Sequence, residues 1–256
     1  MRILTVRIRT LMMAAVLGGA LVLGSGLAYA TEAAQVWQSG ARALPVYSVE
    51  RTDNKIAISF DCAWGTDHTD AILENLAASG VRATFFTVQF WAERYPDYLK
   101  KIAEAGHEIG THSATHSYMS RLSEQEIRAE LSSSAQAITS VTGEAVRLFR
   151  PPYGDYDDLL IEASRAMGLM PIQWDVDSLD WKDLSAADIA ERVTSKVRSG
   201  SIILCHNNGL HTAEALPVIF DVLRAKGFVF VPIGELIYYE NYTIDVTGRQ
   251  IAQAAQ

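Results

Sequence analysis

The chain has 256 residues and a formal net charge of −8 at pH 7. This acidic balance disfavours nucleic acid and anionic lipid as main partners, because both are themselves negatively charged. Neutral polysaccharides remain compatible with it. Two cysteines are too few for a fold held together by disulfides.

The first thirty residues have the pattern of an export signal. A basic start with three arginines precedes an apolar, glycine-rich run over 11–27, and an Ala-Tyr-Ala cleavage site follows at 28–30. We therefore expect residues 1–30 to be a signal peptide and the protein to be secreted or held in the cell envelope. The alternative is an uncleaved membrane anchor, since the run approaches the roughly 20 residues that span a bilayer.

Residues 31–54 show weak periodicity, and we interpret them as a linker and lead-in. From residue 55 to residue 236, short apolar runs alternate with amphipathic stretches, which we take as one domain. Strands are predicted over 56–60, 83–88, 107–110, 148–150, 171–176, 201–206 and 228–232. Helices are predicted over 67–78, 96–105, 123–143, 157–167, 185–200 and 212–226. Residues 237–256 are polar without a pattern and are expected to be a C-terminal tail.

Strands that alternate with helices at this spacing predict parallel βαβ units. Polar residues follow the C-terminal ends of several predicted strands, namely Asp61, His112, Arg150, Asp177 or Asp180, and His206. In parallel α/β barrels this edge carries the active site. The sequence therefore predicts an α/β barrel with a site at that rim.

His112 and His116 lie four residues apart in a segment of Thr, Ser and Gly. This spacing places two imidazoles on one side of a helical turn, close enough to share a metal ion. The alternative is a pair of unrelated surface histidines. The buried strand before the pair and the hydroxyl groups around it favour a metal site.

The remaining polar residues suit acid–base chemistry. Asp61 leaves the first strand, where its carboxylate could take a proton from a metal-bound water or simply cap a turn. Arg150 begins the stiff Arg-Pro-Pro-Tyr153 loop and would keep a neighbouring carboxylate ionised. His206 ends an apolar strand, and Asp180 could raise its pKa to make it a general acid.

Tyr153 and Trp181 stand beside these groups in the sequence. Their rings could stack on sugar rings or pack in the core. The sequence alone leaves both interpretations open.

Five motifs now stand in order along the chain, namely Phe60-Asp61, His112-x3-His116, Arg150-Pro-Pro-Tyr153, Asp177-Ser-Leu-Asp180-Trp181 and Leu204-Cys-His206. Together they resemble the polysaccharide deacetylases, the NodB-homology group or carbohydrate esterase family 4, over about residues 55–236. The resemblance implies a single distorted (β/α)7 barrel with its site at the C-terminal rim of the strands. It also implies metal-dependent removal of N-acetyl groups from GlcNAc or MurNAc polymers, such as cell-wall peptidoglycan.

The resemblance also implies a role for each matching residue. Asp61 is similar to the catalytic base, and Arg150 to the residue that orients this base. His206 and Asp180 resemble the general acid and its charged partner.

Further matching positions imply binding roles. His112 and His116 resemble two metal ligands. Tyr153 is similar to the residue whose backbone N–H helps to bind the oxyanion. Trp181 and Leu204 resemble the lining of the acetyl pocket.

The chain departs from the family pattern at Cys62, where the family usually has a second aspartate as the third metal ligand. Cys62 could be a thiolate ligand, which would favour zinc. It could be a bystander, with a water, Asp67 or His68 completing the metal shell. It could also form a disulfide with Cys205. We expect a divalent metal, zinc before cobalt or manganese.

The leading hypothesis is an exported, metal-dependent de-N-acetylase of peptidoglycan or a related polymer. An O-deacetylase acting on a polysaccharide such as xylan is the alternative enzyme, because the same water attack suits an ester. A glycan-binding barrel without catalysis is the alternative of another class. The expected partner is a cell-wall or other N-acetylated polysaccharide, with no nucleic acid and with membrane contact only through an uncleaved signal segment.

Overall fold

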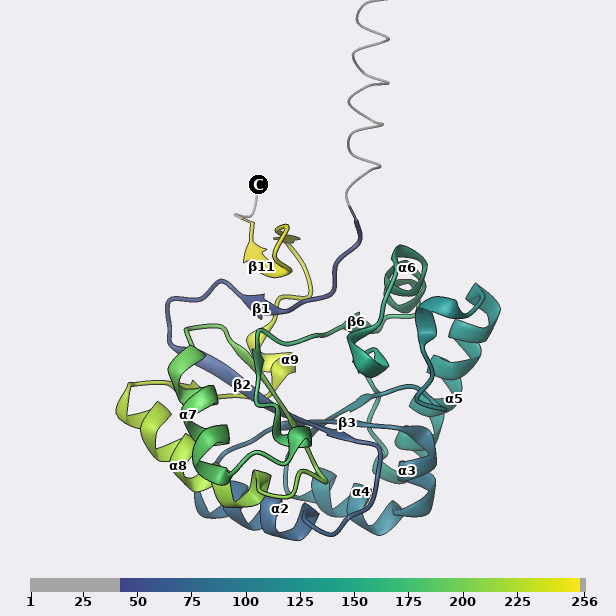
Figure 1. Ribbon diagram of the computed structural model, residues 1–256. Helices are drawn as coiled ribbons and strands as arrows, with labels where there is room; N and C mark the ends of the chain where they lie inside the picture. The colour runs from purple at the N-terminus through teal and green to yellow at the C-terminus, as the bar shows by residue number, and fades with distance from the viewer. Residues whose placement is uncertain (1–41, 254–256) are drawn as a thin grey trace, which may run out of the picture. The chain divides into compact units, whose positions relative to one another are not determined.

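Figure 1 shows the computed structural model, which describes residues 42–253. The predicted signal peptide and the first part of the predicted lead-in lie outside these residues. Among the residues that the structure describes, no helix combines the length and the apolarity needed to cross a membrane. From Ala43 onward the chain forms one folded unit.

A curved sheet of parallel strands forms the centre of this unit, with the strand order β6-β5-β4-β3-β2-β8-β7. In chain order its strands are β2 (Lys55–Cys62), β3 (Thr84–Thr87), β4 (Glu108–Thr111), β5 (Leu148–Phe149), β6 (Met170–Pro171), β7 (Val176–Asp177) and β8 (Ile202–His206). A short strand, β9 (Val229–Phe230), pairs with the beginning of β2. β2 is the central strand, since β3 and β8 flank it.

The helices lie around the outer side of this sheet (Figure 1). They are α2 (Thr69–Ala78), α3 (Gln89–Arg94), α4 (Pro96–Glu104), α5 (Glu124–Thr142), α6 (Asp158–Ala166), α7 (Ala186–Lys196) and α8 (Thr212–Ala225). The short helix α9 (Ile233–Leu236) packs instead on the inner side, against Ala57, Phe86 and Ile202. Short 3-10 turns are η1 (Met119–Arg121), η2 (Pro152–Gly154) and η3 (Asp180–Lys182). Parallel strands with helices outside, open between β6 and β7, confirm the predicted α/β fold, a distorted (β/α)7 barrel.

One predicted strand is wrong in detail. The run over 171–176 is two short strands, β6 and β7, because the residues between them form hydrogen bonds outside a regular ladder. The backbone N–H of Gln173 donates to the carbonyl of Val46 at 2.8 Å. The carboxylate of Asp175 accepts from the backbone N–H of Ile202, also at 2.8 Å.

Alternation along β2 separates the inner side of the barrel from its outer core, because successive side chains of a strand point to opposite faces. Phe60 and Cys62 belong to the apolar cluster that packs the sheet against the helices. The ring of Phe60 stacks on Phe85 of the next strand, with centroids 5.0 Å apart. Ser59 and Asp61 therefore face the inner side, at the end of the longest strand.

Segments at both ends of the folded unit pair with each other. β1 (Ser48–Val49) runs parallel to β11 (Arg249–Ala252), and β10 (Tyr242–Ile244) pairs with β11 in a three-stranded sheet. Isolated bridges join Val46 to Ile172, just after the edge strand β6, and Ser48 to Ser201, just before β8, so residues 46–48 run between these two strands. The boundaries predicted at 55 and 236 thus leave out strands that pack as part of the same unit.

The contact between β1 and the start of β8 generates a test. Gly200 has φ +83°, and a Cβ there would lie 1.7 Å from the carbonyl oxygen of Val49. We expect Gly200→Ala to lower the free energy of unfolding by about 3 kcal/mol or more, measured by denaturant unfolding. Gly168→Ala is the control, because its φ is +77° and no atom lies within 4 Å of the added Cβ. The free energy of unfolding of Gly168→Ala should fall by only about 1 to 2 kcal/mol. An equal fall in the two variants would contradict the close approach of β1 to Gly200.

His107 generates a second test, of pH-dependent stability. Its side chain is buried, and its Nδ1 accepts a hydrogen bond from the backbone N–H of Ala83 at 3.2 Å. Burial, with the nearby charge of Arg82, lowers the pKa of His107 to about 4. The unfolded chain therefore binds this proton at higher pH than the folded chain. The contribution of His107 to the folding free energy is fully present above about pH 6.5 and is lost as the pH falls towards 4.

We expect this one group to cost roughly 3 kcal/mol of folding free energy between pH 7 and pH 4. The measurement compares unfolding curves of the wild type and His107→Gln over this range. The glutamine can accept a hydrogen bond from the same N–H but does not titrate. The variant should therefore lose roughly 3 kcal/mol less folding free energy than the wild type between pH 7 and pH 4. An identical pH dependence would show that His107 is not the group responsible.

Candidate active site

A cavity of about 590 Å³ opens at the C-terminal ends of the strands. Its lining residues are Asp61, Ala63, Trp64, His112, His116, Tyr153, Trp174, Asp177, Trp181, Leu204, His206 and Asn208. Seven of the nine predicted site residues are in this set. The other two, Arg150 and Asp180, are fully buried behind it.

Arg150 holds Asp61 in a buried ion pair. Its Nη1 donates to Asp61 Oδ1 at 2.7 Å, and its Nη2 donates to Ser59 Oγ at 2.8 Å. Burial raises the pKa of the Asp61 carboxyl, but the charges of Arg150 and His206 outweigh it, so the pKa lies below its ordinary value. Asp61 is therefore an anion whose Oδ2 is not used by Arg150.

A hydrogen bond from the His112 ring to the backbone of Arg150 fixes the orientation of this imidazole. Its Nδ1 lies 2.7 Å from the backbone carbonyl of Arg150, which can only accept, so Nδ1 carries the proton. The lone pair on Nε2 is then free on the side of Asp61, whose Oδ2 is 3.5 Å away. Burial lowers the pKa of His112 and keeps the ring neutral.

His116 lies close to His112, but the backbone between them differs from the helical turn that was predicted. Residues 112–118 form an irregular loop and not a helical turn, and both Ser113 and His116 have positive φ, 71° and 58°. The backbone N–H of His116 donates to Ser113 Oγ at 3.0 Å, which closes this turn. The two imidazole centroids still lie 4.9 Å apart, so the predicted proximity holds. Burial lowers the pKa of His116 to about 4.

His206 and Asp180 form the second charged pair. Asp180 Oδ1 lies 2.7 Å from His206 Nδ1, and Oδ2 accepts from the backbone N–H of His206 at 2.7 Å. Thr212 Oγ1 also donates to Oδ2 at 2.7 Å. Burial lowers the pKa of His206, but the hydrogen bond and charge of Asp180 outweigh it, so the pKa lies above its ordinary value. The predicted pairing is present in the structure.

Cys62 does not reach the cavity. It lies on the outer face of β2 in the apolar core, and burial raises the pKa of its thiol well above the ordinary value. A thiolate ligand is therefore not supported, because a ligand must be ionised and face the metal. Both Cys62 and Cys205 are free thiols, so the disulfide interpretation is wrong as well. Asp67 and His68 do not line the cavity.

The imidazoles of His112 and His116 suit a divalent metal, but the described part of the chain places no third protein ligand beside them. Neutral imidazoles are the ligand form that a divalent metal requires, and the buried Nδ1 of His116 has no hydrogen-bond partner in the structure. Within residues 42–253, however, no cluster of three or more His, Cys, Asp and Glu side chains has the geometry of a metal site. Two imidazoles are thus the protein ligands that the described residues offer.

Backbone strain is concentrated around this cavity. Seven non-glycine residues of the described chain have positive φ, and four of them, Ser113, His116, Tyr153 and Leu179, lie in loops that carry site residues. Such conformations cost about 1 to 3 kcal/mol each and persist only where the surroundings impose them. The strain therefore marks loops whose shape is set by the site.

Several residues of the site do not stand out in the sequence. Trp64 and Trp174 line the cavity, and Gln173 accepts from Arg150 through its backbone carbonyl at 3.3 Å. Ser59 could have been found, because it stands two residues before Asp61 and so shares its face of the strand. The others lie in irregular loops, where no periodicity indicates which side chain faces the site.

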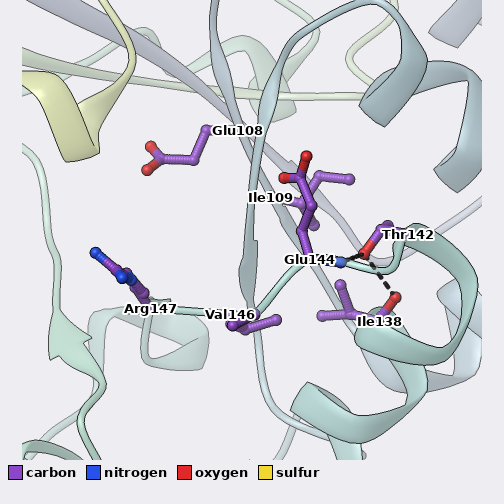
Figure 2. Close-up of a pocket in the computed structure, with 8 residues that line it drawn as sticks. Glu108, Ile109, Ile138, Thr142, Glu144, Val146 and Arg147 are labelled. Atoms are coloured by element: carbon purple, nitrogen blue, oxygen red, sulfur yellow. Dashed lines mark hydrogen bonds between the residues drawn. The ribbon is translucent and has the colours of Figure 1, made fainter.

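A smaller cavity of about 110 Å³ lies near the beginnings of β4 and β5 (Figure 2). Its carboxylate Glu108 accepts from Thr84 Oγ1 at 2.7 Å and from the backbone N–H of Gly234 at 2.9 Å. Figure 2 shows that this carboxylate points away from that of Glu144. Glu108 thus ties β4 to its neighbours, and the cavity has no convergent set of groups.

Comparison with known proteins places these observations in a family. The polysaccharide deacetylase family model matches residues 48–172. A peptidoglycan-N-acetylglucosamine deacetylase of Bacillus cereus is 33% identical over 183 residues, which cover 70% of this chain and 66% of the relative. A second protein of that name from Bacillus cereus is 30% identical over 200 residues, which cover 76% of this chain and 93% of the relative.

Solved structures agree with this assignment. The crystal structure of a carbohydrate esterase family 4 pseudoenzyme from Bacillus anthracis matches with a TM-score of 0.73 at 32% identity, covering 77% of this chain and 70% of that one. The chain spans between 41% and 66% of the length of the first curated relatives. From its matching sequence and fold, the chain belongs to the polysaccharide deacetylase family, carbohydrate esterase family 4.

Proposed function

We propose that the protein is a metal-dependent hydrolase that removes N-acetyl groups from peptidoglycan or a related polymer of GlcNAc or MurNAc. The observation that carries this proposal is the convergence of two charged pairs, Asp61 with Arg150 and His206 with Asp180, on one cavity. Binding a glycan requires neither pair, whereas amide hydrolysis requires a base and an acid. The names of the Bacillus cereus relatives support peptidoglycan as the substrate.

Asp61 is proposed as the general base. Arg150 keeps its carboxylate ionised and holds Oδ1, so Oδ2 is the oxygen that can take a proton from the attacking water. The ion pair is buried, which also fixes the direction of the carboxylate. Arg150 acts here as a positioning residue.

His206 is proposed as the general acid for the departing amine. Because Asp180 accepts from Nδ1, Nε2 is the nitrogen that can give its proton to the leaving group. The raised pKa keeps the ring protonated nearer to neutral pH, as a general acid requires. Asp180 also stabilises the cationic ring between turnovers.

His112 and His116 are proposed to hold the divalent metal, with zinc expected before cobalt or manganese. The bound ion would supply Lewis-acid polarisation of the acetyl carbonyl and of water. The hydrogen bond from His112 Nδ1 to the carbonyl of Arg150 orients this ligand. The remaining ligand positions are open to water and substrate.

Three further residues are proposed to bind the substrate. Leu204 lines the cavity and is buried, which suits the methyl group of the acetyl. Trp181 lines it with an exposed ring that can cover one side of the sugar. Tyr153, held with φ 61° in the rigid Pro-Pro loop, is proposed to offer its backbone N–H to the oxyanion.

The location of the protein is part of the proposal. The pattern of residues 1–30 supports export, and a secreted or cell-envelope protein would meet peptidoglycan directly. Cleavage after Ala30 would release the folded unit from the membrane.

One observation favours a second candidate, a glycan-binding barrel without catalysis. The described residues offer two metal ligands where the family pattern has three, and a similar structure is that of a pseudoenzyme. Acetate release from peptidoglycan, chitooligosaccharide and acetylated xylan decides between the candidates. Release from the first two supports the proposal, release from xylan alone indicates an ester substrate, and binding without release supports the second candidate.

The acid–base assignment predicts the effect of two substitutions. Asp61→Asn and His206→Ala should each lower the turnover number by roughly 10²-fold or more, with oligosaccharide binding retained. Asp221→Asn, on the exposed side of α8, is the matched control and should keep full activity. Because Asp61→Asn leaves Arg150 without its charged partner, a thermal melt must accompany the kinetics. Full activity in either site variant would refute the assignment.

The metal assignment predicts the metal content of the purified protein. Chelation should remove both metal and activity, and zinc, cobalt or manganese should restore them. His112→Ala and His116→Ala should each lower the bound metal measured by atomic emission, because they remove the imidazole ligands. Cys62→Ala should leave the metal content unchanged, since its thiol faces the outer core. Loss of metal in Cys62→Ala would contradict the bystander position of this residue.

A further inference from the structure

Exposed aromatic rings gather at the mouth of the cavity. In the described part of the chain five large aromatic side chains are exposed, and four of them, Trp64, Tyr118, Tyr153 and Trp181, belong to this rim. Tyr118 joins it through its stack on Tyr153, with centroids 4.3 Å apart. Exposed apolar surface that is grouped in this way marks a binding surface. Trp64 lines the cavity itself and has no role in the proposed deacetylation chemistry.

The loop that carries Trp64 is fixed by buried donors. The carbonyl of Gly65 accepts a hydrogen bond from Trp91 Nε1 at 2.8 Å and another from Asn207 Nδ2 at 2.9 Å. Both donor residues are fully buried, so they tie this loop to the core. The backbone that carries Trp64 is therefore held in place before any ligand arrives, which lowers the entropy cost of ordering this loop on binding.

The indole itself is supported on one side and open on another. Its ring centroid lies 5.2 Å from that of Phe90, with the planes tilted by 37°. Trp64 also lines the cavity, and 58% of the residue is exposed. A flat apolar surface is thus presented to whatever enters the cavity.

The position of Trp64 relative to the chemistry indicates what it can bind. It follows Asp61 by three residues, and its ring lies 6.1 Å from that of His116. Trp181 follows β7, and β8 separates β7 from β2, so the strands that lead to the two tryptophans are roughly 10 Å apart. Both indoles line the cavity, each carried by the loop after its own strand. Two platforms indicate two sugar units.

We propose that Trp64 is a stacking platform for a sugar ring next to the ring that is deacetylated, so that the cavity recognises an extended chain of N-acetylated sugars. The C–H face of a pyranose ring packs on the indole, while its hydroxyl and acetamido groups stay at the edge in water. This subsite rests on the proposed deacetylase function for its substrate class. It makes Trp64 a specificity residue for chain length.

The first test measures acetate release from GlcNAc oligomers of two to six sugars. For the wild type, kcat/KM should rise with length once the neighbouring subsite is filled. Trp64→Ala should lower kcat/KM for the pentamer about tenfold through KM, and change the value for the dimer at most about twofold, since tenfold corresponds to the loss of about one stacked ring. An equal loss at all lengths would overturn the proposal and place Trp64 at the reaction centre through His116.

Two more variants separate stacking from folding. Trp64→Phe keeps a flat face and should retain most of the length dependence, whereas Trp64→Leu keeps apolar volume without a flat face and should lose it. If Trp64→Ala does not fold, this pair still decides the question. Tyr239→Ala, an exposed aromatic away from the cavity, is the control and should behave as the wild type. Equal behaviour of the Phe and Leu variants would refute a stacking role.

A binding measurement separates failure of this proposal from failure of the proposed function. Calorimetry with the GlcNAc pentamer is done on Asp61→Asn and on Asp61→Asn with Trp64→Ala, neither of which needs to turn over. About tenfold weaker binding in the second protein is expected even if the wild type releases no acetate. Unchanged binding would overturn the Trp64 platform, whereas absent acetate release alone would overturn only the deacetylase function.

Discussion

The buried ion pair between Arg150 and Asp61 is the interaction on which the rest of the site depends. A guanidinium inside a barrel loses its hydration, and this loss must be offset by hydrogen bonds and charge. Asp61, Ser59 and the carbonyl of Gln173 supply them, and the ring of Phe86 lies 4.1 Å from the guanidinium carbon. One side chain thereby connects the central strand β2 with β3 and with the segment that follows β6.

The same residue also controls the histidine pair. The backbone carbonyl of Arg150 fixes the tautomer of His112, while the side chain of Arg150 fixes the carboxylate that faces His112 Nε2. The base and one proposed metal ligand are therefore oriented by a single position in the chain. Two prolines follow Arg150 and stiffen this loop. Its rigidity matters because a small shift of the backbone would disturb both the Asp61 carboxylate and the His112 imidazole.

Much of the fold could be predicted from the sequence because its signals are periodic. Apolar strands, glycine stops and the capping box at Ser123 indicate parallel βαβ units, and the strand ends indicate where polar residues meet. The pairs Asp61–Arg150 and His206–Asp180 followed from that placement together with the family resemblance.

What the sequence did not reveal depends on contacts between distant segments. The strand β1 lies in a stretch with weak periodicity, and its partners are residues of β11 and the start of β8. The conformation at His116 depends on positive φ angles, which a four-residue spacing does not disclose. The position of Cys62 depends on alternation within β2, and a family comparison alone suggests a ligand there.

The pairing of β1 with β11 has a consequence for how the chain reaches its final form. The first and last strands of the folded unit are neighbours, so the small three-stranded sheet is completed only by the most distant parts of the folded sequence. Such pairings are slow to form, because the loop between them is nearly the whole chain. The central strands can assemble while β1 still lacks its partner. Because β1 and β11 come from opposite ends of the folded unit, their pairing also closes the chain into a ring of contacts that neither end can leave without breaking the small sheet.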